Sequence, residues 1–248
     1  MKYLITSLLL LFCNIPLLAV QTRADSLYAV QNYKEAADEY LLQLENGISD
    51  ELYYNLANCY YRMNDFPHAI LNYQKVLKIN PQHTHARENL KVCLEQSGAE
   101  TYSTSEMFYT TWIKSLIQSR NANQWGTLAI STLCIFIGLV IIFLLSKTSW
   151  IKKLTFFTSI LLFLCVILLN IFAYKSKVSF YTTGHVVTMQ PILLYESATI
   201  QSRQVGEIPA GSILKLNEEF NNEWYNVNTP DGRNAWCQNQ HLEKVEIK

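Results

Sequence analysis

The pattern of hydrophobic positions changes twice along the chain. Between residues 25 and 96 apolar residues recur at helical spacing, and apolar runs without charged residues then cover 126–145 and 154–174. After residue 184, short β-branched and aromatic segments alternate with turn residues such as Pro209 and Gly211. These periods predict a helical module, two membrane-spanning helices and an all-β module, in that order.

Both apolar runs have the length of a membrane span. A helix needs roughly 20 residues to cross a hydrocarbon core of about 30 Å, and neither run contains a charged residue. The connecting segment, 146–153, carries Lys147, Lys152 and Lys153, which indicates the cytoplasmic side. Because no ionisable side chain lies inside either span, we interpret the helices as anchors rather than a transport path.

The N-terminus predicts export. Lys2 precedes an apolar stretch from Leu4 to Val20, which is typical of a signal peptide. We place this peptide at 1–24, with cleavage after Ala19 or Ala24, and an uncleaved anchor is the alternative. In either case the following residues are expected on the non-cytoplasmic side of the membrane.

Residues 24–83 repeat themselves. Four residues recur 33 positions later: Ala24, Ala36, Tyr40 and Leu44 correspond to Ala57, Ala69, Tyr73 and Leu77. A period of this length predicts a solenoid of helix–turn–helix units. The second copy, with Pro81 at its end, resembles a tetratricopeptide repeat, whereas the first copy has Ile48 in place of the proline. A third helix, which Thr84 could cap, is predicted to end the array because Lys91 replaces the small residue.

The resemblance implies a peptide-binding groove along the concave face of the first helices. The matching positions are Glu51, Tyr54, Asn58, Tyr61, Arg62, Glu88 and Glu95. An ordinary solvated face and contact with a second copy of the chain are the alternatives.

Between this module and the first span, in 97–125, Phe108, Trp112 and Leu116 predict an amphipathic helix lying on the outer membrane surface. Docking of that helix on the repeats is the alternative.

The last module, 184–248, is predicted to be a small closed barrel of five short strands. Trp224-Tyr225-Asn226-Val227, then Asp231-Gly232, then Ala235-Trp236-Cys237 resemble a bacterial SH3-like domain. Such domains bind peptides or cell-wall peptide stems, or pack against a neighbour. The candidate groove aromatics are Tyr195, Trp224, Tyr225 and Trp236. For Trp224 and Trp236, a place in the hydrophobic core is an alternative of equal weight.

Composition and motifs argue against catalysis and nucleic-acid binding. The formal net charge is zero and only 16% of residues are charged. No catalytic or nucleotide-binding motif is present, and His83 and His85 have no third metal ligand at useful spacing. Cys59 and Cys93 are expected to be free thiols. We therefore predict no enzyme activity, no metal and no cofactor.

The order of segments is specific although each motif is common. Signal peptide, tetratricopeptide repeats, two spans and an SH3-like domain together resemble the BatE family of Bacteroides aerotolerance proteins over nearly the whole chain. The resemblance implies a multidomain protein of the inner (cytoplasmic) membrane with both soluble modules in the periplasm. It also implies protein partners, among them sister Bat proteins with von Willebrand A domains. Attachment to peptidoglycan through the SH3-like domain is the alternative function.

Overall fold

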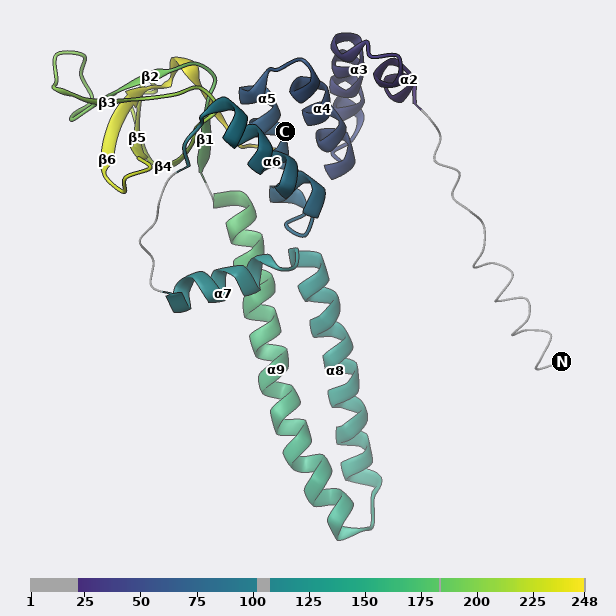
Figure 1. Ribbon diagram of the computed structural model, residues 1–248. Coiled ribbons are helices and arrows are strands. Elements are labelled where there is room, and N and C mark those ends of the chain that lie inside the picture. The colour runs from purple at the N-terminus through teal and green to yellow at the C-terminus, as the bar shows by residue number, and fades with distance from the viewer. Residues whose placement is uncertain (1–21, 102–107, 183, 248) are drawn as a thin grey trace.

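The computed structural model describes residues 22–101, 108–182 and 184–247. It contains a helical-repeat module, a hairpin of two long helices and an antiparallel sheet, and the module and the sheet lie together at one end of the hairpin (Figure 1). We call the repeat module and the sheet together the head. The predicted signal peptide lies almost wholly outside the described residues.

The repeat module has the predicted helix pairs. Its helices are α2 (Arg23–Ala29), α3 (Tyr33–Asn46), α4 (Asp50–Arg62), α5 (Phe66–Ile79) and α6 (Thr84–Ser97). The recurring alanines are completely buried, which lets paired helices approach closely: they are Ala24, Ala36, Ala57 and Ala69. The 33-residue recurrence of these alanines therefore corresponds to close contacts between paired helices.

The last repeat helix differs from expectation at its start. His83, not Thr84, caps α6, because the His83 Nδ1 atom accepts a hydrogen bond from the Ala86 N–H at 3.1 Å. The helix ends at Gly98, which has a left-handed backbone with φ of 65°. The chain then continues to the sheet rather than into another helix.

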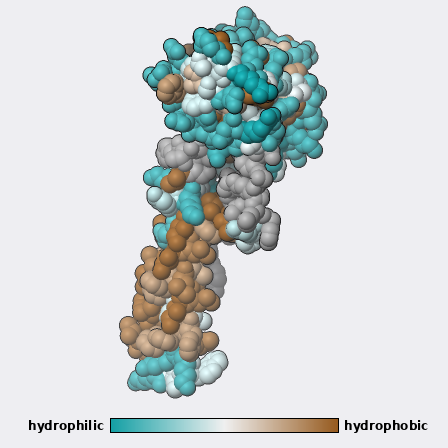
Figure 2. Space-filling model, turned by 90° about the vertical axis from the view of Figure 1, so that its left-hand side faces the viewer, coloured by the Kyte–Doolittle hydropathy of each residue, from teal (hydrophilic) through white to brown (hydrophobic). Residues whose placement is uncertain are grey.

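The hairpin is formed by α8 (Ala122–Leu145) and α9 (Ser149–Thr182). Only 6% of the most apolar window of each helix is buried, so these are not the core helices of a water-soluble fold. Figure 2 shows the hydrophobic band confined to the hairpin, with a hydrophilic surface at both ends. Since α9 begins at Ser149, Lys152 and Lys153 lie in its first turns rather than in a loop.

A further helix, α7 (Phe108–Gln118), precedes the hairpin and lies across it (Figure 1). It contacts α9 at the end of the hairpin that is nearer the head. This contact is with the hairpin, and the location of the helix on the outer membrane surface remains a prediction.

The sheet has seven strands instead of five. They are β1 (His185–Thr188), β2 (Ile192–Tyr195), β3 (Gln204–Ile208), β4 (Ile213–Phe220), β5 (Trp224–Asn228), β6 (Asn234–Gln238) and β7 (Leu242–Lys244). Their order is β3-β2-β6-β5-β4-β1-β7, with antiparallel neighbours throughout. The sequence pattern did not indicate β3, which ends just before the turn residue Pro209, or β7. No ladder among the described residues joins β3 to β7, so the sheet is not the closed barrel that was predicted.

The repeats and the sheet share one hydrophobic core. Val187, Ile213 and Val245 from the sheet region belong to the same buried cluster as Ile70 and Tyr73 from α5. A second cluster lies inside the sheet, and a third lies between α2, α3 and α4. The end of the repeat array is therefore covered by the sheet as well as by α6.

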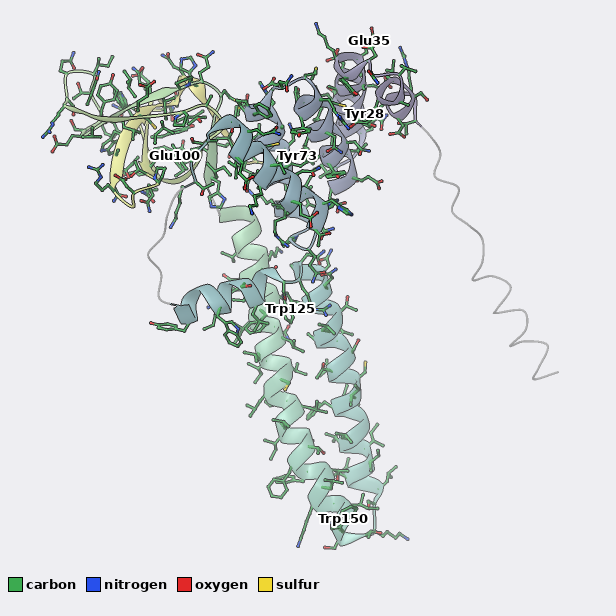
Figure 3. All side chains as sticks on the ribbon, viewed as in Figure 1. Tyr28, Glu35, Tyr73, Glu100, Trp125 and Trp150 are labelled. Carbon is green, nitrogen blue, oxygen red and sulfur yellow. The ribbon has the colours of Figure 1, made fainter. Side chains whose placement is uncertain are left out.

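Hydrogen bonds reinforce this junction. The segment after α6 extends the sheet, because the Glu100 N–H donates to Ser212 Oγ at 2.9 Å and the Ile213 N–H donates to the Glu100 carbonyl at 2.9 Å. Figure 3 shows Glu100 at the boundary between the repeats and the sheet. Thr101 also forms a parallel bridge with Ile213. The head is consequently one packed body rather than two modules on a flexible linker.

Candidate partner-binding surfaces

Three of the predicted groove residues lie on one face of α4. Tyr54, Asn58 and Tyr61 follow each other at i, i+4 and i+7, and all three are half-buried. The hydrogen bonds that join the repeats to the sheet involve Lys78 on α5 and the segment after α6.

A polar network fixes the side-chain amide of Asn58. The Tyr73 hydroxyl donates to Asn58 Oδ1 at 2.6 Å, and the Asn89 amide nitrogen lies 3.2 Å from the same oxygen. Asn89 is also within hydrogen-bond distance of Tyr54 Oη and Tyr73 Oη. Because two donors converge on Oδ1, the amide nitrogen of Asn58 must point the other way. Asn58 is thus oriented to donate toward a carbonyl outside the network.

The two groove tyrosines have partners inside the molecule. The Tyr54 ring lies 4.8 Å from the His83 ring and 6.0 Å from the Tyr73 ring, measured between centroids. The Tyr61 ring lies 6.2 Å from that of Phe66. The two tyrosine rings form the half-buried floor of a surface.

The remaining groove candidates are exposed charges. Glu51 is exposed near the start of α4, and its N–H donates to Ser49 Oγ at 3.2 Å. Arg62 is exposed at the end of α4, where a hydrogen bond with Tyr28 raises the pKa of its guanidinium. On α6, Glu88 lies 3.8 Å from His85 and Glu95 lies 3.7 Å from Lys91. Such exposed pairs contribute little to stability, so these side chains remain available to a partner.

The sheet brings three of its four candidate aromatics together. Tyr195 and Trp236 are cross-strand partners, and the Tyr195 and Trp224 rings meet edge to face at 5.5 Å. Phe220, which sequence reasoning missed, pairs with Trp224 and lies 6.1 Å from the Trp236 ring. We call these four residues the aromatic face. The alternation of side chains along β4, paired with β5, could have identified Phe220 from the sequence.

The aromatic face lies opposite the core of the sheet. Leu194, Val227 and Cys237 point into the internal cluster, and the aromatic residues alternate with them along the same strands. Tyr195 and Trp224 are nearly buried by their neighbours, whereas Phe220 is 45% exposed. Tyr225 was predicted to join this groove but lies in the internal cluster, because it occupies the inward register of β5.

The cysteines of the head are buried hydrophobes rather than reactive thiols. Cys59 and Cys93 are free and belong to different clusters. Burial raises the pKa of Cys59 to about 12 and that of Cys93 to about 11, which disfavours the nucleophilic thiolate. The described residues also hold no group of three metal-ligating side chains, and Nδ1 of His83 is used as a helix cap.

Two family models match parts of the chain. The tetratricopeptide repeat model matches residues 51–83, which are α4, α5 and the turn before α6. The bacterial SH3 domain model matches residues 194–243, which run from the end of β2 into β7. Both are families of interaction domains without typical catalytic activity. None of the curated proteins matches the chain. The family model does not cover α2 and α3. These helices still pack as a repeat unit, because Ala24 and Ala36 are buried like their counterparts in the second repeat.

Proposed function

We propose that this protein is a membrane-anchored adaptor that binds protein partners through the α4 face of its repeats. The observation that carries the proposal is the orientation of Asn58, whose amide oxygen is held internally while its nitrogen is turned outward. An outward amide N–H beside two half-buried tyrosine rings suits the carbonyl of an extended peptide. The tetratricopeptide match over 51–83 supports the same class of ligand.

The hairpin is the proposed anchor. Its exposed apolar surface suits lipid, and Lys147, Lys152 and Lys153 gather at the end farthest from the head. The positive-inside rule then puts those lysines in the cytoplasm and the head in the periplasm. We infer an inner-membrane location from this orientation and from the predicted signal peptide.

The resemblance to the BatE family supports a more specific role. On that basis we infer that the protein belongs to a membrane complex for aerotolerance or stress response, with sister Bat proteins that carry von Willebrand A domains as partners. The fused head would present the α4 face and the aromatic face at a constant separation. Two weak contacts on one rigid body give strong joint binding through effective concentration.

A second candidate function is attachment to peptidoglycan. The observation that favours it is the aromatic face, where Phe220 is exposed on the side of the sheet away from its core. The bacterial SH3 match over 194–243 includes this face. On this hypothesis the sheet would hold the cell wall and the repeats would be displayed beside it.

The adaptor proposal is tested by cross-linking and affinity purification of the full chain from its native membrane. Asn58→Asp keeps an acceptor for Tyr73 but removes the outward N–H donors, and Asn46→Asp on α3 is the matched control. We expect a defined set of membrane proteins to be recovered with the control and lost with Asn58→Asp. Equal recovery with both variants, when both unfold at the parent temperature, would refute the α4 face as the binding site.

Sedimentation of the detergent-solubilised full chain with purified peptidoglycan distinguishes wall binding from the adaptor proposal. Phe220→Ser removes an exposed ring of the aromatic face, and Ile200→Ser, which is 60% exposed in the β2–β3 loop, is the control. Co-sedimentation that Phe220→Ser alone abolishes would favour wall attachment. Absence of co-sedimentation by the parent protein would exclude it.

A further inference from the structure

The helix α7 is locked to the head end of the hairpin. Ile117 is buried, and the Trp125 indole N–H donates to its carbonyl oxygen at 3.0 Å. Trp125 in turn meets Phe172 of α9 edge to face at 5.2 Å. Below this point α8 contains the uncharged, mostly apolar 20-residue segment 126–145, which spans about 30 Å. Trp125, which Figure 3 shows at the head end, therefore marks one boundary of the apolar band.

One side of α7 is apolar and exposed. Tyr109, Trp112, Ile113 and Leu116 recur at helical spacing and are 50%, 67%, 40% and 36% exposed. Such a cluster of exposed rings and aliphatic side chains on a short helix is unfavourable in water. Aromatic side chains are enriched where hydrocarbon meets headgroups, because their rings are apolar and their N–H or O–H groups are polar.

The neighbouring charges suit a lipid surface. Arg120 follows α7 after Ser119, and Ser176 of α9 donates to the Arg120 carbonyl oxygen at 3.2 Å, which brings the two segments together. Lys175 and Lys177 are exposed on that part of α9. Three cations beside an apolar helix face complement anionic headgroups above hydrocarbon. The helix that carries this face is held at the head end of the hairpin by the hydrogen bond between Trp125 and Ile117.

We propose that α7 is an interfacial helix whose Tyr109–Leu116 face inserts into the outer leaflet and sets the orientation of the head. The inference rests on the proposed membrane hairpin. The head has two chain connections to these helices, because the segment after α6, which bridges to β4 at Thr101, continues toward α7, and α9 continues toward β1. With α7 held in the lipid surface, the head cannot turn freely about α9.

The test uses the full chain with its five tryptophans replaced biosynthetically by 5-fluorotryptophan. The protein is reconstituted in bilayers of phosphatidylethanolamine and phosphatidylglycerol, and single Trp→Phe variants assign the fluorine resonances. Lipids with a nitroxide near the headgroup broaden resonances at the interface, and a water-soluble gadolinium chelate broadens exposed ones. Trp125 and Trp150 report on the two ends of the hairpin, whereas Trp224 and Trp236 report on the head.

We expect the interfacial nitroxide to broaden Trp112, Trp125 and Trp150 and to leave Trp224 and Trp236 sharp. Broadening of Trp112 by the gadolinium chelate alone would overturn the inference and leave α7 in water. Protection of Trp112 from both agents would also overturn it, in favour of contact with protein. If Trp125 and Trp150 also escape the nitroxide, the hairpin itself is not inserted, and the proposed anchor fails independently of α7.

Discussion

The ammonium group of Lys78 on α5 donates a hydrogen bond to the backbone carbonyl of Val245, 2.8 Å away and 167 positions later in the chain. Val245 is buried in the core shared by the repeats and the sheet. This contact joins the second repeat to the segment after β7. Removing this hydrogen bond therefore tests whether the repeats and the sheet fold as one body.

Lys78→Met should destabilise the head. Methionine retains most of the aliphatic stem but removes the donor, so the carbonyl of Val245 is left unpaired at a cost of about 1–3 kcal/mol. Thermal unfolding of the full chain in detergent should show a lower midpoint, and Lys34→Met, at an exposed site on α3, should leave it unchanged. An unaltered midpoint for Lys78→Met would mean that the modules are not docked.

Gly211 tests the packing of the same junction. Its φ is +84°, and an added Cβ would lie 2.9 Å from Ile70 Cδ1. We expect Gly211→Ala to cost about 1 kcal/mol from its backbone alone, and more from the contact with Ile70. Ile70→Val removes Cδ1, so the double variant should be more stable than the sum of the single effects predicts. Strict additivity in this double-mutant cycle would contradict the contact.

The head should lose stability in mild acid because of His185. Burial, with Lys78 and Lys215 nearby, lowers the pKa of His185 to about 4 from an ordinary 6.5. The folded head keeps this ring neutral while the unfolded chain protonates it, so the free energy of unfolding falls as the pH drops from 6.5 toward 4. The loss is roughly 1.4 kcal/mol per pH unit in that window. Unfolding of the parent and of His185→Gln at pH 7 and pH 5 should show a smaller change in the variant, whereas equal changes would exclude His185 as the cause.

The buried thiols should resist alkylation. Burial raises the pKa of Cys237 to about 12, as it does for Cys59, so the thiolate fraction at pH 8 falls about a thousandfold from that of an ordinary thiol. Iodoacetamide followed by peptide mass mapping should modify both sites only after unfolding in guanidinium chloride. Rapid labelling of the folded protein at either site would show that its cluster is open.

The mature chain should retain Thr22. The Thr22 hydroxyl accepts from the Asp25 N–H at 3.3 Å and the Asp25 carboxylate accepts from the Thr22 N–H at 2.9 Å, which caps α2. Ala24 is fully buried beneath them. Cleavage after Ala24 would remove both features, so cleavage after Ala19 is the favoured alternative. Intact-mass measurement on the exported protein decides this, and an N-terminus at Asp25 would contradict it.

Sequence alone determined the order and type of the three modules. The 33-residue recurrence located the paired helices, and the apolar runs located the hairpin, because both signals depend on neighbours within a turn or on segment length. Strand alternation indicated an SH3-like sheet but missed β3 and β7, whose short segments have little pattern of their own. Spacing also placed Tyr54, Asn58 and Tyr61 on one face of α4.

Only the tertiary structure decided how these elements meet. The docking of sheet on repeats, the inward place of Tyr225, the addition of Phe220 to the aromatic face and the outward turn of the Asn58 amide all depend on contacts between distant segments. Local periodicity carries no information about such pairings, since many partners of similar size and polarity satisfy the same pattern. The choice among them is made by the packing of specific surfaces, as Lys78 and Val245 illustrate.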